Sequence, residues 1–256
     1  MAFDFTKYRD AGALHWREMT SRSVFVFNAY QQARYQIALD ALGNLSGKTI
    51  VDLGAGDGAF TSLLARCAAK VIAVDNEPKG VELARSVFKK EGLAAEFVIG
   101  SVEDIPLPTA CADAVVSCDV IEHIDHYEQH IAEAARILKP GGVLVVTTPY
   151  RISEHPSPFH TREFFPGELK AFAAPYFTDI SLRETHHMFW FALYSYRPKL
   201  FRGIHIGRIF VNILTLWFGV NPFLKDSSTR KKRDYYTQIT LKAIKPGTLE
   251  PCASSS

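Results

Sequence analysis

From Gly47 onward, short runs of apolar, mostly β-branched residues alternate with segments whose apolar residues recur every three or four positions. Continuous apolar runs are typical of parallel strands covered on both faces, and the longer spacing indicates helices with one face against the sheet. The predicted strands are Thr49–Leu53, Val71–Asp75, Glu96–Ile99, Ala114–Cys118 and Val143–Thr148, and the predicted helical faces lie within residues 60–67, 81–88 and 127–138. This alternation predicts an α/β fold with a Rossmann-like, mostly parallel seven-stranded sheet and helices on both faces.

The two ends of the chain depart from this alternation. Apolar residues at positions 30, 33, 37 and 41 predict a helical cap before the first strand. After Tyr150 the pattern predicts a helix near 167–174 and two strands near 177–182 and 236–243, separated by too many residues for a hairpin turn. We expect one domain over residues 1–256, made of a helical cap (1–46), a cofactor-binding core (47–185), an insertion or lid (186–234), the last strand (235–244) and a disordered tail (245–256).

Composition and charge narrow the class of protein. Hydrophobic residues make up 47% of the chain, charged residues 22%, and the formal net charge is +2, which excludes a chain that is disordered throughout. So small a net charge gives no whole-molecule attraction to nucleic acid or to an anionic membrane, and any such affinity must be local. The first residues lack the continuous apolar stretch of a signal peptide, so we expect a cytoplasmic protein.

A glycine-rich turn directly after the first predicted strand is the strongest local signal. Residues 51–59 read Val-Asp-Leu-Gly-Ala-Gly-Asp-Gly-Ala. Glycines permit a sharp turn and close approach of a ligand, and free amides at the next helix start offer hydrogen-bond donors. Asp75 ends the second strand, where a carboxylate can accept bonds from both hydroxyls of a ribose. The glycine-rich turn and Asp75 together predict an adenosine-containing ligand. A nicotinamide dinucleotide is the alternative, because Gly54, Gly56 and Ala59 also satisfy G-x-G-x-x-A.

The acid at Asp52 followed by G-x-G-x-G resembles the first motif of the class I S-adenosylmethionine-dependent methyltransferases. Residues 100–106, 118–124 and 138–142 resemble, in order, the family's adenine-side loop, its segment after the fourth strand and its turn before the fifth. In the family the position of Ser101 is often an aspartate that contacts adenine, and Glu103 is the possible substitute here. The resemblance implies S-adenosyl-L-methionine as cofactor, held by Asp52, Gly54, Ala55, Gly56, Gly58, Asp75, Asn76, Ser101, Val102, Glu103 and Cys118.

Arg34 is a further residue of this expected cofactor site, and Asn76 has a second expected role. Arg34 on the cap helix is a candidate partner for the carboxylate of the cofactor, and a solvated helix arginine is the alternative. Asn76 is expected to cap the helix that follows it, which leaves Asp75 free for the ribose.

The segment after the fourth strand carries the expected catalytic residues. Methyl transfer from a sulfonium is an in-line displacement with an activated donor, so the protein must align the acceptor and, for a hydroxyl, remove its proton. His123 is the candidate base because an imidazole titrates near neutrality, and a capping or surface role is the alternative. Asp119 and Glu122 lie within one turn of His123 and complete the expected catalytic set.

The same segment leaves a metal site open as an alternative. Asp119, Glu122 and His123, joined by His155 or His160, would suit a divalent metal. The set resembles the metal site of small-RNA 3′-terminal 2′-O-methyltransferases, in which E-x-x-E-H is completed by a distant histidine. We expect no metal, and a metal-dependent RNA ribose 2′-O-methyltransferase, an NAD-dependent oxidoreductase and a non-catalytic cofactor-binding subunit are the alternative functions.

The insertion contains an apolar run at Ile209–Val220 that is too short to span a bilayer, which needs about twenty residues. We expect a core or lid helix, with peripheral membrane contact through residues 204–224 as the alternative. Nearby basic residues would suit an anionic lipid or a phosphorylated acceptor; they are Arg197, Lys199, Arg202, Arg208 and Arg230, Lys231, Lys232 and Arg233. The sequence therefore predicts O-methylation of a small-molecule, sugar or lipid-linked acceptor, which it favours over a nucleic acid.

Overall fold

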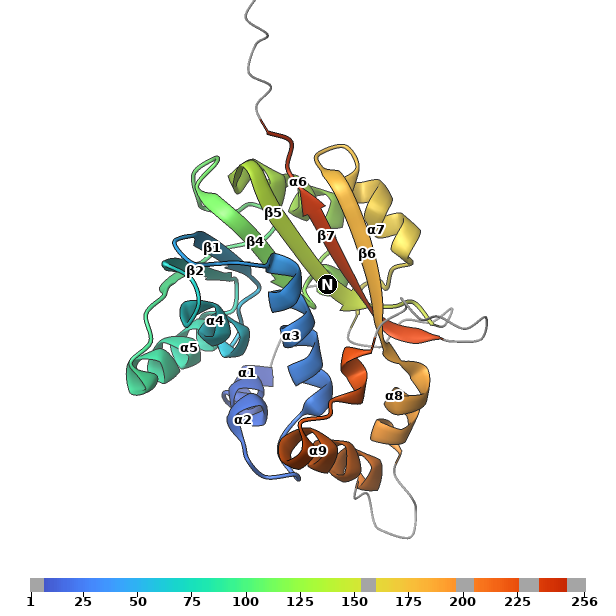
Figure 1. Ribbon diagram of the computed structural model, residues 1–256. Helices are drawn as coiled ribbons and strands as arrows, with labels where there is room; N and C mark the ends of the chain where they lie inside the picture. The colour runs from blue at the N-terminus through green and yellow to red at the C-terminus, as the bar shows by residue number, and fades with distance from the viewer. Residues whose placement is uncertain (1–6, 153–159, 197–204, 226–234, 248–256) are drawn as a thin grey trace, which may run out of the picture.

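The computed structural model describes residues 7–152, 160–196, 205–225 and 235–247. Seven strands form one sheet in the order β3-β2-β1-β4-β5-β7-β6 (Figure 1). They are β1 (Thr49–Leu53), β2 (Lys70–Asp75), β3 (Glu96–Ile99), β4 (Ala112–Cys118), β5 (Leu138–Pro149), β6 (Thr178–His187) and β7 (Tyr236–Ile244). Every neighbouring pair is parallel except the two that involve β7. The predicted mostly parallel sheet is therefore confirmed.

Helices cover both faces of the sheet. The described ones are α1 (Lys7–Ala11), α2 (Leu14–Thr20), α3 (Ala29–Leu42), α4 (Ala59–Ala65), α5 (Pro78–Glu91), α6 (Tyr127–Ile137), α7 (Pro166–Ala173), α8 (Met188–Ser195) and α9 (Ile206–Phe218), with short 3-10 turns η1 (Ile121–His123) and η3 (Pro222–Leu224). Helix α3 crosses in front of the sheet in Figure 1, and α6 and α7 lie behind it. Helices α8 and α9 lie below the sheet in this view.

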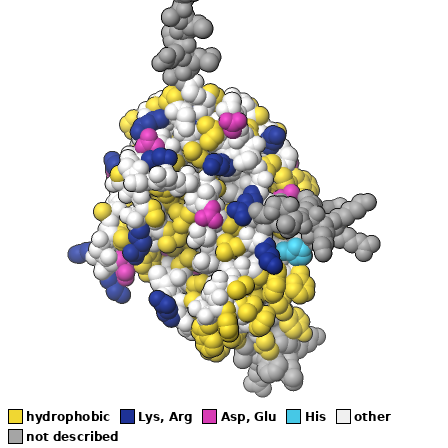
Figure 2. Space-filling model, viewed as in Figure 1, with side chains coloured by type: hydrophobic (Ala, Val, Ile, Leu, Met, Phe, Trp, Pro, Cys, Tyr) yellow, Lys and Arg dark blue, Asp and Glu magenta, His cyan; other side chains and the backbone are white. Residues whose placement is uncertain are grey.

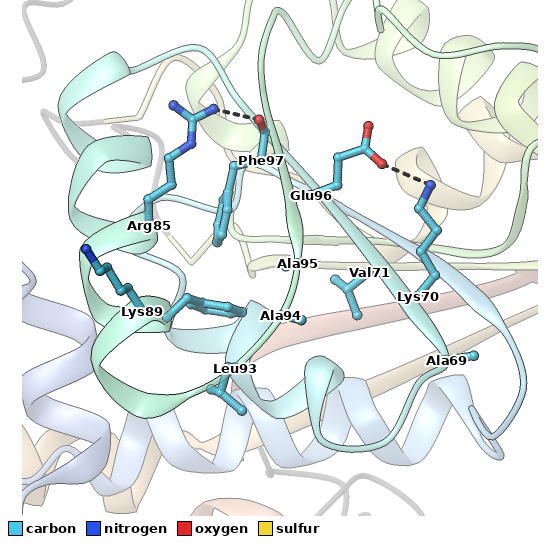
Figure 3. A pocket seen from close by; sticks show the side chains of 11 residues that line it. Ala69, Lys70, Val71, Arg85, Lys89, Leu93, Ala94, Ala95, Glu96 and Phe97 are labelled. Atoms are coloured by element: carbon cyan, nitrogen blue, oxygen red, sulfur yellow. Dashed lines mark hydrogen bonds and ion pairs between the residues drawn. The ribbon is translucent and has the colours of Figure 1, made fainter.

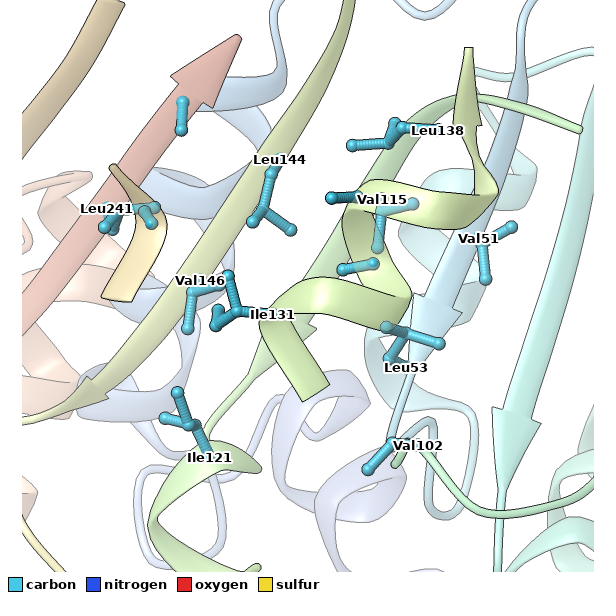
Figure 4. Packing of buried hydrophobic residues seen from close by; sticks show 14 of the residues in the cluster. Val51, Leu53, Val102, Val115, Ile121, Ile131, Leu138, Leu144, Val146 and Leu241 are labelled. Atoms are coloured by element: carbon cyan, nitrogen blue, oxygen red, sulfur yellow. The ribbon is translucent and has the colours of Figure 1, made fainter. Parts of the chain in front are cut away.

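The sheet separates two hydrophobic clusters. One joins α6 and α7 to residues on one face of β1, β4, β5 and β7, with Ile131, Leu144 and Val146 fully or almost fully buried (Figure 4). The other joins α3 and α4 to the opposite face, through Tyr35, Phe60 and Val145. Alternate residues of β5 enter different clusters, as the two-residue period of a strand requires. The continuous apolar runs in the sequence are thus explained by burial on both sides.

Two strands extend further than the sequence predicted. Strand β5 begins at Leu138, whereas the sequence placed a turn at 138–142; the pairing with β4 shifts register there, and Gly141 has φ +75°. Strand β6 continues through His187, beyond the predicted 177–182, because its far end pairs with β7 up to Tyr236. Pairing with a neighbouring strand, which a single segment does not reveal, determines both limits.

The carboxyl ends of β1, β2, β4, β5 and β6 share one edge of the sheet, since all run parallel to one another. Helix α8 begins at this edge directly after β6. The disordered tail predicted over 245–256 is wrong at its start, because Lys245 donates to the carbonyls of Ala135 and Leu138. The rest of that tail beyond residue 247, His155 and the basic residues at 197–202 and 230–233 lie outside the described residues. Ligands in open α/β sheets bind at the carboxyl edge, so the loops at this edge are where a ligand site is expected.

Candidate active site

The glycine loop between β1 and α4 has left-handed backbone at every glycine. Gly54, Gly56 and Gly58 have φ values of +75°, +55° and +78°, which a residue with a Cβ rarely adopts. The amides of Gly54 and Ala55 both donate to the carbonyl of Val74, at 2.8 and 3.2 Å, and so bind the loop to the end of β2. The loop is therefore a fixed turn at the carboxyl edge, as the sequence predicted.

Asp75 lies directly beside this loop. One carboxylate oxygen accepts a bond from the Gly56 amide at 2.7 Å, and the other accepts from the Glu77 amide at 2.8 Å. Burial, with the side chain 8% exposed, raises the pKa of Asp75 above its usual value despite these two bonds. The helix cap predicted at Asn76 is wrong: Glu77 is the N-cap of α5 and accepts from the Lys79 amide, and Asn76 is exposed.

Asp52 is more deeply enclosed than Asp75. Its side chain is 2% exposed and accepts a 2.6 Å hydrogen bond from the Thr61 hydroxyl. Burial raises the pKa of Asp52 to about 7, although the Thr61 bond works in the opposite direction. The Asp52 carboxyl, near the end of β1 before the glycine loop, therefore titrates near neutral pH.

The loop after β3 carries the residues expected near adenine. The Glu103 amide donates to the Ser101 hydroxyl at 3.0 Å, and the Glu103 carboxylate accepts from the His126 amide at 2.8 Å. Val102 is buried, and its carbonyl lies 3.0 Å from Nδ1 of the fully buried His130. Ser101 and Glu103 are thus held side by side in one turn, which β3 places next to the end of β2.

Two residues that the sequence analysis did not single out connect the N-terminal cap to the glycine loop. The Tyr8 hydroxyl of α1 lies against Gly56, so closely that a Cβ at Gly56 would overlap it. The Asp57 carboxylate accepts bonds from the amides of His15 and Trp16, at 2.8 and 3.1 Å. Although burial opposes ionisation, these bonds and the neighbouring His15 ring lower the pKa of Asp57. Helix α1 therefore meets the glycine loop through Tyr8, and α2 is anchored there by a carboxylate that satisfies two of its free amides.

At the end of β4, Asp119 adopts a left-handed conformation with φ +54°, which is uncommon for a residue with a side chain. Its carboxylate pairs with the Arg34 guanidinium and accepts a 3.3 Å bond from the Thr147 hydroxyl. Arg34 also bonds to Gln31 and lies over the Tyr30 ring, 5.2 Å from its centroid. Arg34, predicted as a cofactor residue, therefore lies at the carboxyl edge, where its guanidinium is paired with the Asp119 carboxylate.

Cys118 precedes Asp119 in β4 and is partly buried. Burial raises the pKa of its thiol well above the usual value, as do the nearby carboxylates of Asp119 and Asp52. The thiol is therefore neutral at physiological pH, and it contributes shape rather than charge to the site.

Glu122, His123 and His160 come together beyond this point. Their possible ligand atoms lie within 4.8 Å of one another. The His123 and His160 rings meet edge to face at 5.2 Å, and Nδ1 of His160 lies 2.8 Å from the Glu163 carboxylate. The cluster joins η1 to the segment before α7, because the Glu122 carbonyl accepts from the amide of Thr161 at 2.7 Å.

The chemistry of this cluster depends on Glu122. Its carboxyl is 1% exposed and accepts a 3.0 Å bond from the Thr148 hydroxyl. Burial raises the pKa of Glu122 well above its usual range, and the neighbouring Asp119 carboxylate adds to this effect. Glu122, His123 and His160 could supply three ligands to a divalent cation, but Asp119, expected as a further ligand, is paired with Arg34 instead. The Arg34 charge opposes a dication near that end of the cluster.

A hollow of about 470 Å³ lies elsewhere on the molecule (Figure 3). It is bordered by Lys70 and Glu96, which form an ion pair, and by Arg85, which donates to the Phe97 carbonyl. Lys70 begins β2 and Glu96 begins β3, so the hollow belongs to the amino edge of the sheet. It is separate from the candidate active site.

Comparison with known proteins agrees with this geometry. Residues 51–146 match the methyltransferase domain family. A probable S-adenosylmethionine-dependent methyltransferase of Mycolicibacterium smegmatis is 33% identical over 147 residues, which cover 55% of this chain and 56% of that protein. A ubiquinone biosynthesis O-methyltransferase of Xanthomonas oryzae pv. oryzae is 31% identical over 145 residues, or 56% of each chain. The chain thus spans little more than half the length of these relatives.

A solved structure extends the likeness of fold over most of the chain. Phosphoethanolamine N-methyltransferase 2 of Haemonchus contortus, in complex with S-adenosyl-L-methionine, superposes with a TM-score of 0.66 at 18% identity. The superposition covers 96% of this chain and 60% of that one. The matched family, the ordered motifs and the sheet topology agree: residues 51–146 form a methyltransferase domain similar to those of S-adenosylmethionine-dependent methyltransferases.

Proposed function

We propose that this protein transfers the methyl group of S-adenosyl-L-methionine to a hydroxyl of a small-molecule, sugar or lipid-linked acceptor. The observation that carries the proposal is that a left-handed glycine loop and a carboxyl–imidazole cluster share the carboxyl edge of one sheet. The first suits the cofactor and the second suits a proton transfer. The relative named for ubiquinone biosynthesis acts on oxygen by its name, which supports an oxygen acceptor.

In this proposal the glycine loop and Asp75 hold the cofactor. A carboxylate has about four acceptor positions, so Asp75 can bind ribose hydroxyls while it keeps the amides of Gly56 and Glu77. Ser101 and Glu103 are the proposed adenine-side contacts. The remaining proposed cofactor residues are Asp52, Gly54, Ala55, Gly58, Asn76, Val102, Cys118 and Arg34.

His123 is the proposed general base. The acceptor oxygen forms a bond to the methyl carbon as the carbon–sulfur bond breaks, S-adenosylhomocysteine leaves, and the hydroxyl proton passes to the imidazole of His123. Glu122 and His160 lie within 4.8 Å of this residue and are proposed to orient its ring. Asp119 is proposed to act through its pair with Arg34, whose position it sets.

The test uses methyl-labelled S-adenosyl-L-methionine and an extract of metabolites and lipids from cells that lack the protein. We expect a labelled product with the wild type, and a rate lowered by about 10²–10⁴-fold in His123→Ala with calorimetric cofactor affinity nearly unchanged. His126→Ala, an exposed histidine three positions away, serves as the matched control. Equal loss of cofactor affinity in His123→Ala would contradict the role as base, and no labelled product with any extract would contradict methyl transfer.

A metal-assisted transfer is the second candidate, favoured by the three clustered ligand atoms. A divalent cation there would polarise the acceptor oxygen. It predicts that a chelator abolishes transfer, that a divalent ion restores it, and that His160→Ala is as damaging as His123→Ala. Full activity in chelator would exclude it and leave the histidine base.

A further inference from the structure

The described residues of α8, α9 and the turn after α9 expose an unusual amount of apolar surface. We define the α8–α9 surface by Phe189, Tyr196, Phe210, Trp217, Phe218 and Val220, all of them exposed. Trp217 and Phe218 are 69% and 68% exposed. Figure 2 shows hydrophobic side chains gathered over the lower part of the molecule, where α8 and α9 lie in Figure 1. Apolar patches of this kind on a folded chain indicate a binding surface.

The opposite side of α9 is firmly attached to the rest of the fold. Asn212 is fully buried, accepts from the Ala29 amide and donates to the carbonyls of Val24 and Phe27. Arg208 pairs with Glu18 and donates to the carbonyl of Phe27. These bonds fix the rotation of the helix, so the exposed stripe through Phe210 and Trp217 faces outward as a preformed surface.

The charge and the residue types of this surface indicate which kind of partner it binds. From Met188 to Lys225 the sequence contains no Asp or Glu but five Lys or Arg residues. Arg208 is neutralised by Glu18, and Lys225 follows η3. The other three, Arg197, Lys199 and Arg202, belong to the segment between α8 and α9, outside the described residues. Tryptophan, tyrosine and phenylalanine are the side chains that favour the boundary between lipid headgroups and acyl chains. An apolar aromatic surface within a segment whose unpaired charges are all positive in sequence is complementary to an anionic bilayer, which attracts Lys and Arg.

Length determines how α9 would meet such a bilayer. Its 13 residues extend about 20 Å, less than the roughly 30 Å of a hydrocarbon core. Among the described helices none is long and apolar enough to cross a membrane. We propose that the α8–α9 surface docks onto an anionic membrane, with α9 lying in the plane of the interface and Trp217 and Phe218 inserted between the headgroups.

Helix α8 and the turn η3 are connected to the candidate active site through Tyr30 and Arg34. Tyr30 packs against Phe191 and Tyr194 of α8 and Phe223 of η3, with ring centroids 5.6, 6.4 and 5.1 Å away. The Arg34 guanidinium, which pairs with Asp119, also lies over the Tyr30 ring. Docking would therefore bring the site close to the bilayer, although the docking itself does not depend on the proposed methyl transfer.

The test is flotation of the full chain with vesicles of phosphatidylcholine mixed with phosphatidylglycerol, and with vesicles of phosphatidylcholine alone. We expect flotation with the mixed vesicles at low salt, weaker flotation at high salt, and little with phosphatidylcholine alone. Trp217→Ser should lower the partition coefficient by about ten- to 100-fold, since it removes a large apolar side chain from the interface. Tyr176→Ser, an exposed aromatic before β6, is the matched control and should float like the wild type.

A second measurement reports insertion directly. The chain has three tryptophans, so Trp16→Phe/Trp190→Phe leaves Trp217 as the reporter. Its emission should shift to the blue with the mixed vesicles and be quenched by brominated acyl chains. The proposal is overturned if the wild type does not float, if Trp217→Ser floats equally, or if Trp217→Ser instead abolishes self-association measured by sedimentation, which would make the surface a contact between two copies.

Discussion

Gly54 is a position where the glycine loop tolerates little change, and Gly54→Ala tests why. Its φ of +75° places it in left-handed backbone, which costs a residue with a Cβ about 1–2 kcal/mol. The new Cβ would also overlap Cγ2 of Val120 and lie 3.1 and 3.2 Å from its Cγ1 and Cβ. Val120 packs against the large hydrophobic cluster and has little room to move, so overpacking adds about 1–3 kcal/mol. We expect Gly54→Ala to lower the free energy of unfolding by about 2–5 kcal/mol.

The chain supplies a control that separates these two costs. Gly92 has φ +65° but nothing within 4 Å of an added Cβ, so Gly92→Ala should lose only the backbone cost of about 1–2 kcal/mol. In Gly54→Ala/Val120→Ala the two γ carbons are absent, and part of the loss should return. Urea unfolding at constant m-value measures all three variants. If Gly54→Ala loses no more stability than Gly92→Ala, the contact with Val120 does not constrain the loop.

Three carboxylates provide the remaining predictions. Asp75→Ala should weaken S-adenosyl-L-methionine binding by about five- to 150-fold in calorimetry, and an unchanged affinity refutes the ribose contact. Burial raises the pKa of Asp52 to about 7 from its usual 3.8. Between these two pH values the folded protein keeps a proton that the unfolded chain releases, so the free energy of unfolding falls as the pH rises from 3.8 to about 7. Asp52→Asn should flatten this slope in urea titrations at several pH values; an identical slope means that Asp52 is ionised when folded. Asp57→Ala removes the acceptor for two amides of α2 and should cost about 1–2 kcal/mol, with faster proteolysis between residues 11 and 20; unchanged proteolysis would show that other contacts hold α2.

The sequence was informative where a feature depends on neighbours along the chain. The central parallel strands β1, β2, β4 and β5 have continuous apolar runs, and the glycine loop needs glycine at each left-handed position. Both signals are local, because the burial of a strand and the conformation of a turn restrict residue type directly. The positions of Asp75 and of Glu122 with His123 followed from the rule that ligands bind at the carboxyl edge.

Features that depend on long-range contacts could not be predicted in the same way. Nothing near Tyr8 in the sequence indicates that its hydroxyl meets Gly56. Asp57 resembles any polar loop residue until α2 presents its amides to it. Asp119 was grouped with Glu122 because they share one turn, but its left-handed backbone directs the carboxylate to Arg34 of α3.

The strand order has a consequence for the emerging nascent chain. Strand β6 lies at the edge of the sheet, and its one partner there is β7. Because β7 also lies between β5 and β6, β6 has no place in the sheet until residues 236–244 have left the ribosome. Helices α8 and α9 are made in the meantime, with their aromatic side chains unsupported by the completed sheet. Synthesis through this interval is therefore when the chain is most exposed to aggregation and most dependent on chaperones.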